Sequence, residues 1–163
     1  MDEKTKAVAF ATLVPGAAYV VGYGLYFREG SAMREMFKKA KKPKWITDDE
    51  ATLSVIDLAT LAPAVYAAYG IYRLGGFDHE DTRLALTAYG AMYASTIGMS
   101  FVITCRKSWP LWFWLSVGFN ALQAMTAALF FSVDRKYGLM MLPMTVWGHI
   151  GVLMSHEMCE MND

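Results

Sequence analysis

Five long apolar stretches constrain what this chain of 163 residues can fold into. A bilayer core about 30 Å thick is crossed by ~20 residues of helix. Inside lipid a segment must satisfy its own backbone hydrogen bonds, and these stretches lack the alternation of barrel strands, so we expect helices. The predicted spans are 7–27, 53–74, 84–104, 109–133 and 138–155. The sequence therefore predicts an all-α membrane protein, a single bundle of five transmembrane helices with one long loop at 28–52, forming one domain over 1–163.

The charged residues lie mainly outside these spans. Hydrophobic residues make up 55% of the chain, and 15 basic and 15 acidic side chains give a formal net charge of zero. This balance gives no electrostatic footprint for a nucleic acid, and membrane lipid is the expected partner. One lysine-rich run at 38–44 stands out in the long loop. We interpret it as a solvated surface attracted to anionic lipid; the alternative is a loop that docks a partner or covers a site as a lid.

A few side chains inside the spans are candidates for lining a ligand pocket. Asp57 is the one acidic residue well inside a span, where a charge is costly and usually faces a cavity or a partner. Trp147 lies near the middle of the fifth span, and its indole N–H needs an internal partner. Tyr19, Tyr23 and Tyr26 share one face of the first span. Such a face serves either as bundle core or as a wall for a flat hydrophobic ligand.

Most other aromatic residues fit the belts that form at membrane interfaces, where amphipathic rings meet the headgroups. Trp45, Trp109 and Trp112 are predicted at the interface on the side of the long loop. Tyr89 and Tyr93 are predicted near the opposite interface.

The third span carries a ladder of small residues, Gly90, Ala94 and Gly98. Small residues at this spacing let two helix backbones approach closely. The ladder predicts either the seam of a homodimer or a helix crossing inside the bundle.

The fifth span carries three residues with metal-binding side chains on roughly one face, His149, His156 and Glu160. This spacing would suit a metal or a haem, but two histidines without a motif are more often packing or interfacial residues. The sequence contains no Ser/His/Asp grouping, paired catalytic carboxylates or glycine-rich phosphate loop. We therefore expect a protein that is not an enzyme, with no metal site and no required cofactor; the alternative is an enzyme that modifies a porphyrin.

Collinear motifs resemble one known family. Thr12-Leu13-Val14-Pro15 is similar to that family's first helix, and Lys42-Pro43-Lys44-Trp45 to its long first loop. Trp109 matches its turn from the third to the fourth helix. Met140-Met141-Leu142-Pro143, with Trp147 four residues later, looks like its Leu-Leu-x-Pro-Tyr-x-x-Trp signature. The chain thus resembles the translocator protein family, also called the peripheral benzodiazepine receptor or tryptophan-rich sensory protein family.

This resemblance implies a five-helix bundle, often dimeric, which in eukaryotes lies in the mitochondrial outer membrane. It implies binding of cholesterol, porphyrins and synthetic aromatic drugs in a pocket under the first loop, with a porphyrin or haem as a candidate ligand. Trp109 and Trp147 match family residues that line the pocket, and Trp45 matches its lid. The candidate ligand-binding residues are Tyr23, Tyr26, Trp45, Asp57, Trp109, Trp112, Pro143, Trp147 and Gly151.

The chain also departs from the family pattern. A pocket tryptophan of the family's second helix is replaced at Asp57. The Gln, Asn and Trp positions of the family's third helix hold Gly90, Ala94 and Ile97. The C-terminal cholesterol motif has lost its tyrosine and arginine, since the chain reads Met154-Ser155-His156-Glu157 there and ends the motif at Glu160. We therefore expect a divergent member that binds, and by resemblance transports, tetrapyrroles or cholesterol-like lipids; the alternative is a structural protein that assembles through its helices and loop.

Overall fold

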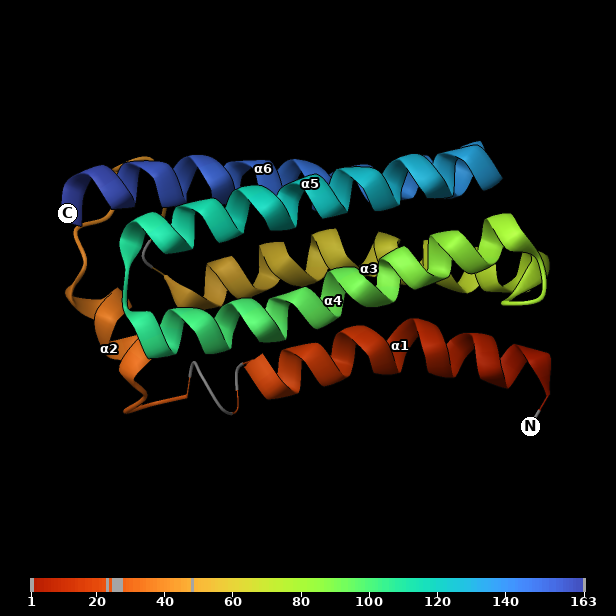
Figure 1. Cartoon of the computed structure of the whole chain (residues 1–163), viewed down its shortest axis with the longest axis horizontal. Coiled ribbons are helices and arrows are strands. Elements are labelled where there is room, and N and C mark those ends of the chain that lie inside the picture. Colours follow the sequence, from red (N-terminus) through yellow and green to blue (C-terminus); the bar gives the residue numbers. More distant parts are fainter. Residues whose placement is uncertain (1, 23, 25–27, 48, 163) are drawn as a thin grey trace.

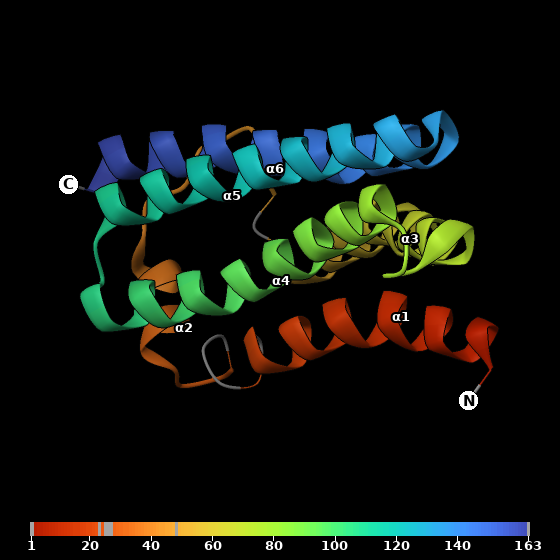
Figure 2. The same cartoon turned by 45° about the vertical axis from the view of Figure 1, so that its right-hand side comes forward.

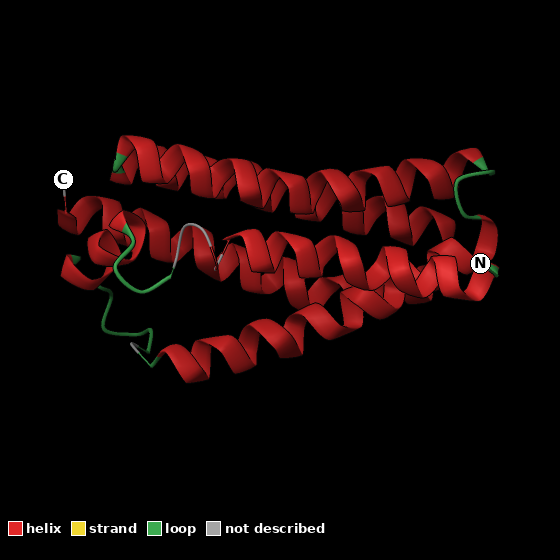
Figure 3. Cartoon of the chain, turned by 90° about the horizontal axis from the view of Figure 1, so that it is seen from below, coloured by secondary structure: helices red, strands yellow, loops and turns green. Residues whose placement is uncertain are grey.

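The computed structural model describes residues 2–22, 24, 28–47 and 49–162, which form six helices and no strand (Figure 1, Figure 3). The helices are α1 (Glu3–Val21), α2 (Ala32–Lys39), α3 (Glu50–Gly75), α4 (Glu80–Arg106), α5 (Trp109–Val133) and α6 (Arg135–Asn162). The predicted all-helical class is confirmed, but the predicted number of five helices is wrong. The extra helix, α2, lies inside the expected loop 28–52, because eight amphipathic residues suffice for two turns without a long apolar run.

Four of the helices are long and apolar enough to cross a membrane. They are α4, α5, α6 and the Ala51–Gly75 part of α3, which contain four of the five predicted spans. Within the described residues α1 is not among them, because Lys4 and Lys6 fall in its first two turns and its helix ends at Val21. The predicted span 7–27 reaches residues 23 and 25–27, which lie outside the described part.

The helices pack in layers (Figure 1, Figure 2). α5 and α6 form one layer, and α3 and α4 form the next, with α3 against α6 and α4 against α5. α1 lies on the far side of α3 and α4, and its described residues contact neither α5 nor α6. The two ends of the chain lie at opposite ends of the bundle, as an odd number of long helices requires.

The core between α1, α3 and α4 combines small side chains with tyrosines. Ala64, Ala67 and Ala68 of α3 are fully buried and belong to the same core cluster as Ala11 and Ala18 of α1. Tyr89 is 0% exposed, and its hydroxyl donates a hydrogen bond to the carbonyl of Ala11 over 3.2 Å. Tyr93 is also buried. The prediction that these two tyrosines lie in an interfacial belt is therefore wrong, because α4 is enclosed by α1, α3 and α5 along this part of its length.

Short polar side chains define where the helices begin. Ser31 caps α2, Asp49 caps α3 and Ser108 caps α5, each accepting a hydrogen bond from a backbone N–H of the first turn. The hydrogen bonds from Thr52 hold the pKa of Asp49 below its usual value. Gly76 ends α3 with a φ of 55°, a conformation that favours glycine, and the chain turns there into α4.

The turn from α5 to α6 brings the two backbones close together at Gly138. A Cβ atom added to Gly138 would overlap the Cα and Cβ of Phe131 and lie 2.6 Å from its backbone nitrogen. Because backbone atoms cannot swing aside like a flexible side chain, any larger residue would force α5 and α6 apart.

We predict that Gly138→Ala destabilises the protein by about 1–3 kcal/mol, the typical effect of overpacking. Gly98→Ala is the matched control, since an added Cβ there meets nothing within 4 Å and alanine favours the helix. The midpoint of thermal unfolding in a mild detergent measures the difference. Equal midpoints for the two variants would contradict the tight turn.

Candidate functional site

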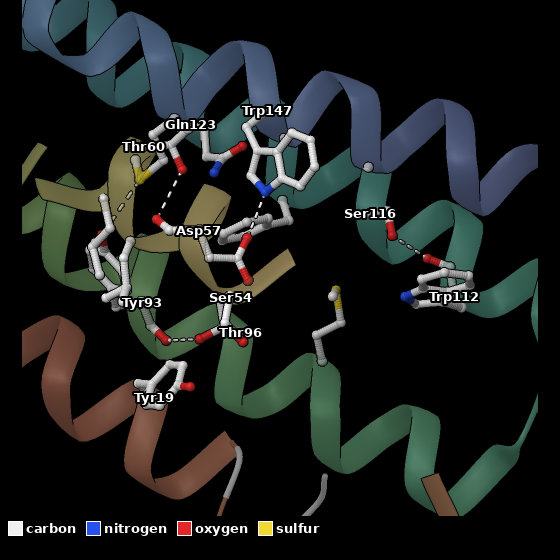
Figure 4. Close-up of a pocket in the computed structure, with 17 residues that line it drawn as sticks. Tyr19, Ser54, Asp57, Thr60, Tyr93, Thr96, Trp112, Ser116, Gln123 and Trp147 are labelled. Carbon is white, nitrogen blue, oxygen red and sulfur yellow. Dashed lines mark hydrogen bonds between the residues drawn. The ribbon is translucent and has the colours of Figure 1, made fainter. Parts of the chain in front are cut away.

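A cavity of about 400 Å³ lies between the five long helices (Figure 4). Its walls are mostly apolar and aromatic. The lining residues are Tyr19, Ser54, Asp57, Leu58, Thr60, Leu61, Tyr93, Thr96, Met99, Trp112, Ser116, Phe119, Gln123, Met144, Trp147, Gly148 and Gly151. A volume of this size suits a small organic ligand.

A second, shallower cavity of about 290 Å³ adjoins the first on the side of α1. The two share Tyr19, Leu61, Tyr93 and Thr96 in their walls. Pro15 and Ala18 of α1 line the second cavity. The internal space therefore continues toward the face on which α1 covers α3 and α4.

The central polar contact of the cavity joins α3 to α6. The indole Nε1 of Trp147 donates a hydrogen bond to Oδ1 of Asp57 over 2.6 Å (Figure 4). The sequence predicted that Trp147 needs an internal partner and that Asp57 faces a cavity or a partner, and the two prove to be partners of each other. The pair joins α3 to α6 through two residues that are 90 positions apart in the chain.

Three hydroxyl groups in the cavity wall are already bonded to their own helix. Thr96 donates to the carbonyl of Tyr93 over 2.7 Å, and Ser116 donates to the carbonyl of Trp112 over 2.9 Å. Thr60 likewise donates to the carbonyl of Asp57. Because a hydroxyl has a single hydrogen, these groups present no free donor, and the wall behaves as a largely apolar surface.

An aromatic cluster closes the end of the bundle next to the cavity. Phe37 of α2 lies edge-on to Trp109, with ring centroids 5.5 Å apart, and edge-on to Trp112 at 4.8 Å. Trp112 belongs both to this cluster and to the cavity wall, whereas Trp109 packs one layer behind it. The apolar face of α2, with Met36 and Phe37, thus packs on the ends of α4, α5 and α6.

The segment between α2 and α3 is fastened to the last turns of α6. Nε1 of Trp45 donates to the carboxylate of Glu157, 2.9 Å from each oxygen. The backbone N–H of Lys41 donates to Oδ1 of Asn162 over 2.8 Å, and the amide of Asn162 donates back to the carbonyl of Lys41. Trp45 therefore holds the segment over this end of the bundle but is not part of the cavity wall.

The predicted ligand-binding residues divide into three groups. Those in the cavity wall are Asp57, Trp112, Trp147 and Gly151. Those placed outside it are Trp45, Trp109 and Pro143. Tyr23 and Tyr26 lie outside the described residues, although Tyr19 from the same predicted face does line the cavity.

Sequence reasoning missed the polar face of α5. Ser116, Asn120 and Gln123 follow the i, i+4, i+7 spacing and so share one side of an otherwise apolar helix. Ser116 and Gln123 line the cavity, and Asn120 lies immediately behind Gln123. This spacing could have indicated the polar face of the cavity from the sequence, since uncharged polar groups inside a span also need hydrogen-bond partners.

The candidate metal ligands do not come together. Nδ1 of His149 lies 3.3 Å from Oδ1 of Asn120, while His156 lies near Glu160 on the exposed side of α6. Within the part of the chain that the structure describes, no group of three His, Cys, Asp or Glu side chains is placed to hold a metal ion.

The small-residue ladder of α4 faces outward. A Cβ added to Gly90 or Gly98 would meet nothing within 4 Å, and Ala94 is exposed. Of the two interpretations, a helix crossing inside the bundle is therefore wrong, because no described helix of this chain crosses α4 there.

This arrangement defines an integral membrane protein whose helical bundle encloses an apolar cavity with few polar groups. The chain belongs to the TspO/MBR family, whose model matches residues 10–160. The match confirms the family resemblance drawn from the order of its prolines and tryptophans. A search of curated proteins finds no match to this chain.

We predict that Asp57 and Trp147 are energetically coupled. A hydrogen bond to a carboxylate in a site of low polarity contributes more than one in water, so a double-mutant cycle of Asp57→Ala and Trp147→Phe should give a coupling of about 1 kcal/mol. Unfolding by sodium dodecyl sulfate in mixed micelles measures it. The control cycle pairs Asp57→Ala with Trp114→Phe, because Trp114 is 66% exposed on the outer face of α5. Additive effects in both cycles would contradict the coupling.

Proposed function

We propose that this protein binds flat, largely apolar ligands, tetrapyrroles or cholesterol-like lipids, in the cavity between its five long helices. The observation that carries the proposal is the cavity itself, about 400 Å³ in volume and walled by Trp112, Trp147 and Phe119. Ligand sites are typically concave and apolar with a few oriented polar groups, which matches this cavity and its Asp57–Trp147 pair.

The ligand enters, in this proposal, from the lipid on the side of α1. The neighbouring cavity there shares Tyr19 and Tyr93 with the main one, so a ligand passes between α1 and the α3–α4 pair without crossing the aromatic cluster. The segment between α2 and α3, which Trp45 fastens to Glu157, covers the end of the bundle at the last turns of α6 and serves as a lid. Membrane transport by this protein would follow from binding and release along this path.

Protoporphyrin IX dimethyl ester tests the proposal through tryptophan fluorescence, because Trp112 and Trp147 lie in the cavity wall. We predict quenching that saturates at about one porphyrin per chain in detergent. Trp147→Phe should weaken the apparent affinity about tenfold, since it removes an indole from the wall and leaves Asp57 without its hydrogen bond.

Trp114→Phe is the matched control, because it also removes one tryptophan but from the outer surface. It should leave the affinity unchanged. Quenching that grows linearly with porphyrin, or equal affinities in the two variants, would show that the porphyrin partitions into the micelle instead of the cavity. A cholesterol analogue that displaces the porphyrin would place sterols in the same site.

A second function, homodimer assembly, is favoured by the outward-facing ladder of α4. Gly90, Ala94 and Gly98 leave a shallow strip on the surface into which a second copy of the helix would fit. We predict that Ala94→Leu reduces a crosslinked dimer in native membranes, while Ala59→Leu, at an exposed position of α3, does not. A dimer that survives Ala94→Leu would rule out this seam.

A further inference from the structure

Gln123 is an unusual side chain for its place in the fold. It lies near the middle of α5, is 3% exposed, and lines the cavity beside Trp147 and Gly148 (Figure 4). A primary amide has two donors and one acceptor oxygen, and each is costly to leave unbonded away from water. The partners of this amide therefore indicate what the cavity presents to a ligand.

The orientation of Gln123 is set by Asn120, one turn earlier in α5. Nδ2 of Asn120 donates to the carbonyl of Thr145 over 3.1 Å and to Oε1 of Gln123 over 3.2 Å. A backbone carbonyl only accepts hydrogen bonds, so Asn120 must turn its NH₂ group toward Thr145 and not its oxygen. The same NH₂ group then requires the oxygen of Gln123 to face Asn120.

His149 of α6 completes this orientation from the outer side. Its Nδ1 lies 3.3 Å from Oδ1 of Asn120. Because that oxygen can only accept, the contact is a hydrogen bond when Nδ1 carries the proton. Both donors of Asn120 are thus engaged between α5 and α6, its acceptor is engaged as well when Nδ1 of His149 carries the proton, and the donors hold Gln123 in one orientation.

Gly148 makes room for this arrangement. A Cβ added to Gly148 would overlap Oε1 of Gln123 and lie 2.8 Å from Nδ2 of Asn120. With the oxygen of Gln123 turned toward Asn120 and Gly148, its Nε2 is left over. No described residue accepts a hydrogen bond from Nε2, in contrast to the hydroxyl of Ser116, which is bonded within its own helix.

We propose that Nε2 of Gln123 is a fixed hydrogen-bond donor inside the cavity, and that it selects ligands with an uncharged acceptor oxygen, such as an ester or ketone carbonyl. This inference rests on the proposed ligand-binding function. Asp57 lines the same cavity, and its carboxylate repels an anionic ligand group, which favours a neutral acceptor over a carboxylate. Asn120 acts as a positioning residue behind this donor.

Two porphyrins that differ in carbonyl groups test the proposal. Etioporphyrin has only methyl and ethyl substituents, whereas mesoporphyrin dimethyl ester has the same ring and two additional ester groups. We expect the wild-type protein to bind the ester about five- to tenfold more tightly, as a single hydrogen bond in an apolar site would provide. Gln123→Met, which keeps the length of the side chain but has no donor, should bring this ratio close to one.

Ser116→Ala is the matched control, because it removes a polar group from the same wall whose hydrogen is already used. It should keep the wild-type ratio. If Gln123→Met does not fold, Asn120→Leu provides the test: it frees the amide of Gln123 to turn and should lower the ratio while etioporphyrin still binds. A purely structural role for Asn120 would alter both affinities equally and would overturn its part in the proposal.

The outcomes separate this inference from the proposed function. Saturable binding of both porphyrins with a ratio that is unchanged in Gln123→Met overturns the role of Gln123 and leaves the ligand-binding function standing. A failure of both porphyrins to bind the wild-type protein saturably overturns the proposed function, and this inference with it. A ratio that falls in Gln123→Met and is kept in Ser116→Ala supports both.

Discussion

The interior of a bilayer has no water to bond a polar group, so polar groups within the spans need hydrogen-bond partners in the protein itself. The backbone of each long segment is satisfied by helix formation. The same demand explains the partners of polar side chains within the spans: the indole of Trp147 donates to Asp57, and the buried hydroxyl of Tyr89 donates to a carbonyl of α1. Asn120 donates to the carbonyl of Thr145 and to Oε1 of Gln123, and its Oδ1 lies 3.3 Å from Nδ1 of His149. The positions of these pairs then determine where the helices touch and where a cavity remains.

The parts of the fold that the sequence could predict are those that depend on composition over about 20 residues. The span 109–133 coincides with α5, and three others lie within α3, α4 and α6. α6 continues to Asn162, well beyond the predicted end at 155, because a helix that leaves the membrane no longer needs apolar residues. α2 escaped prediction for a related reason, since its short amphipathic pattern depends on the aromatic cluster that it covers.

The sequence could indicate single residues of the site, but not which of them contact each other. Asp57 and Trp147 each stood out because a polar group inside a span is costly, yet nothing in the sequence links two positions 90 residues apart. Trp109 matched a family pocket residue but lies one layer behind Trp112, since Phe37 of the unpredicted helix α2 packs against both. Membership in the TspO/MBR family accounts for the shared framework, while Asp57 and Gln123 give this cavity a polarity of its own.

Trp112 belongs both to the aromatic cluster under α2 and to the cavity wall, and this has a thermodynamic consequence. One side of its ring meets Phe37 of a surface helix, and another faces the cavity. Linkage between two sites is reciprocal. A ligand that shifts the ring of Trp112 would therefore change how stably α2 packs on the bundle, and detachment of α2 would change the ligand affinity by the same free energy. α2 ends in Lys38 and Lys39, which respond to the charge of the membrane surface. If a ligand occupies the cavity as proposed, its affinity and the charge of the lipid headgroups outside are therefore linked through Trp112 and α2.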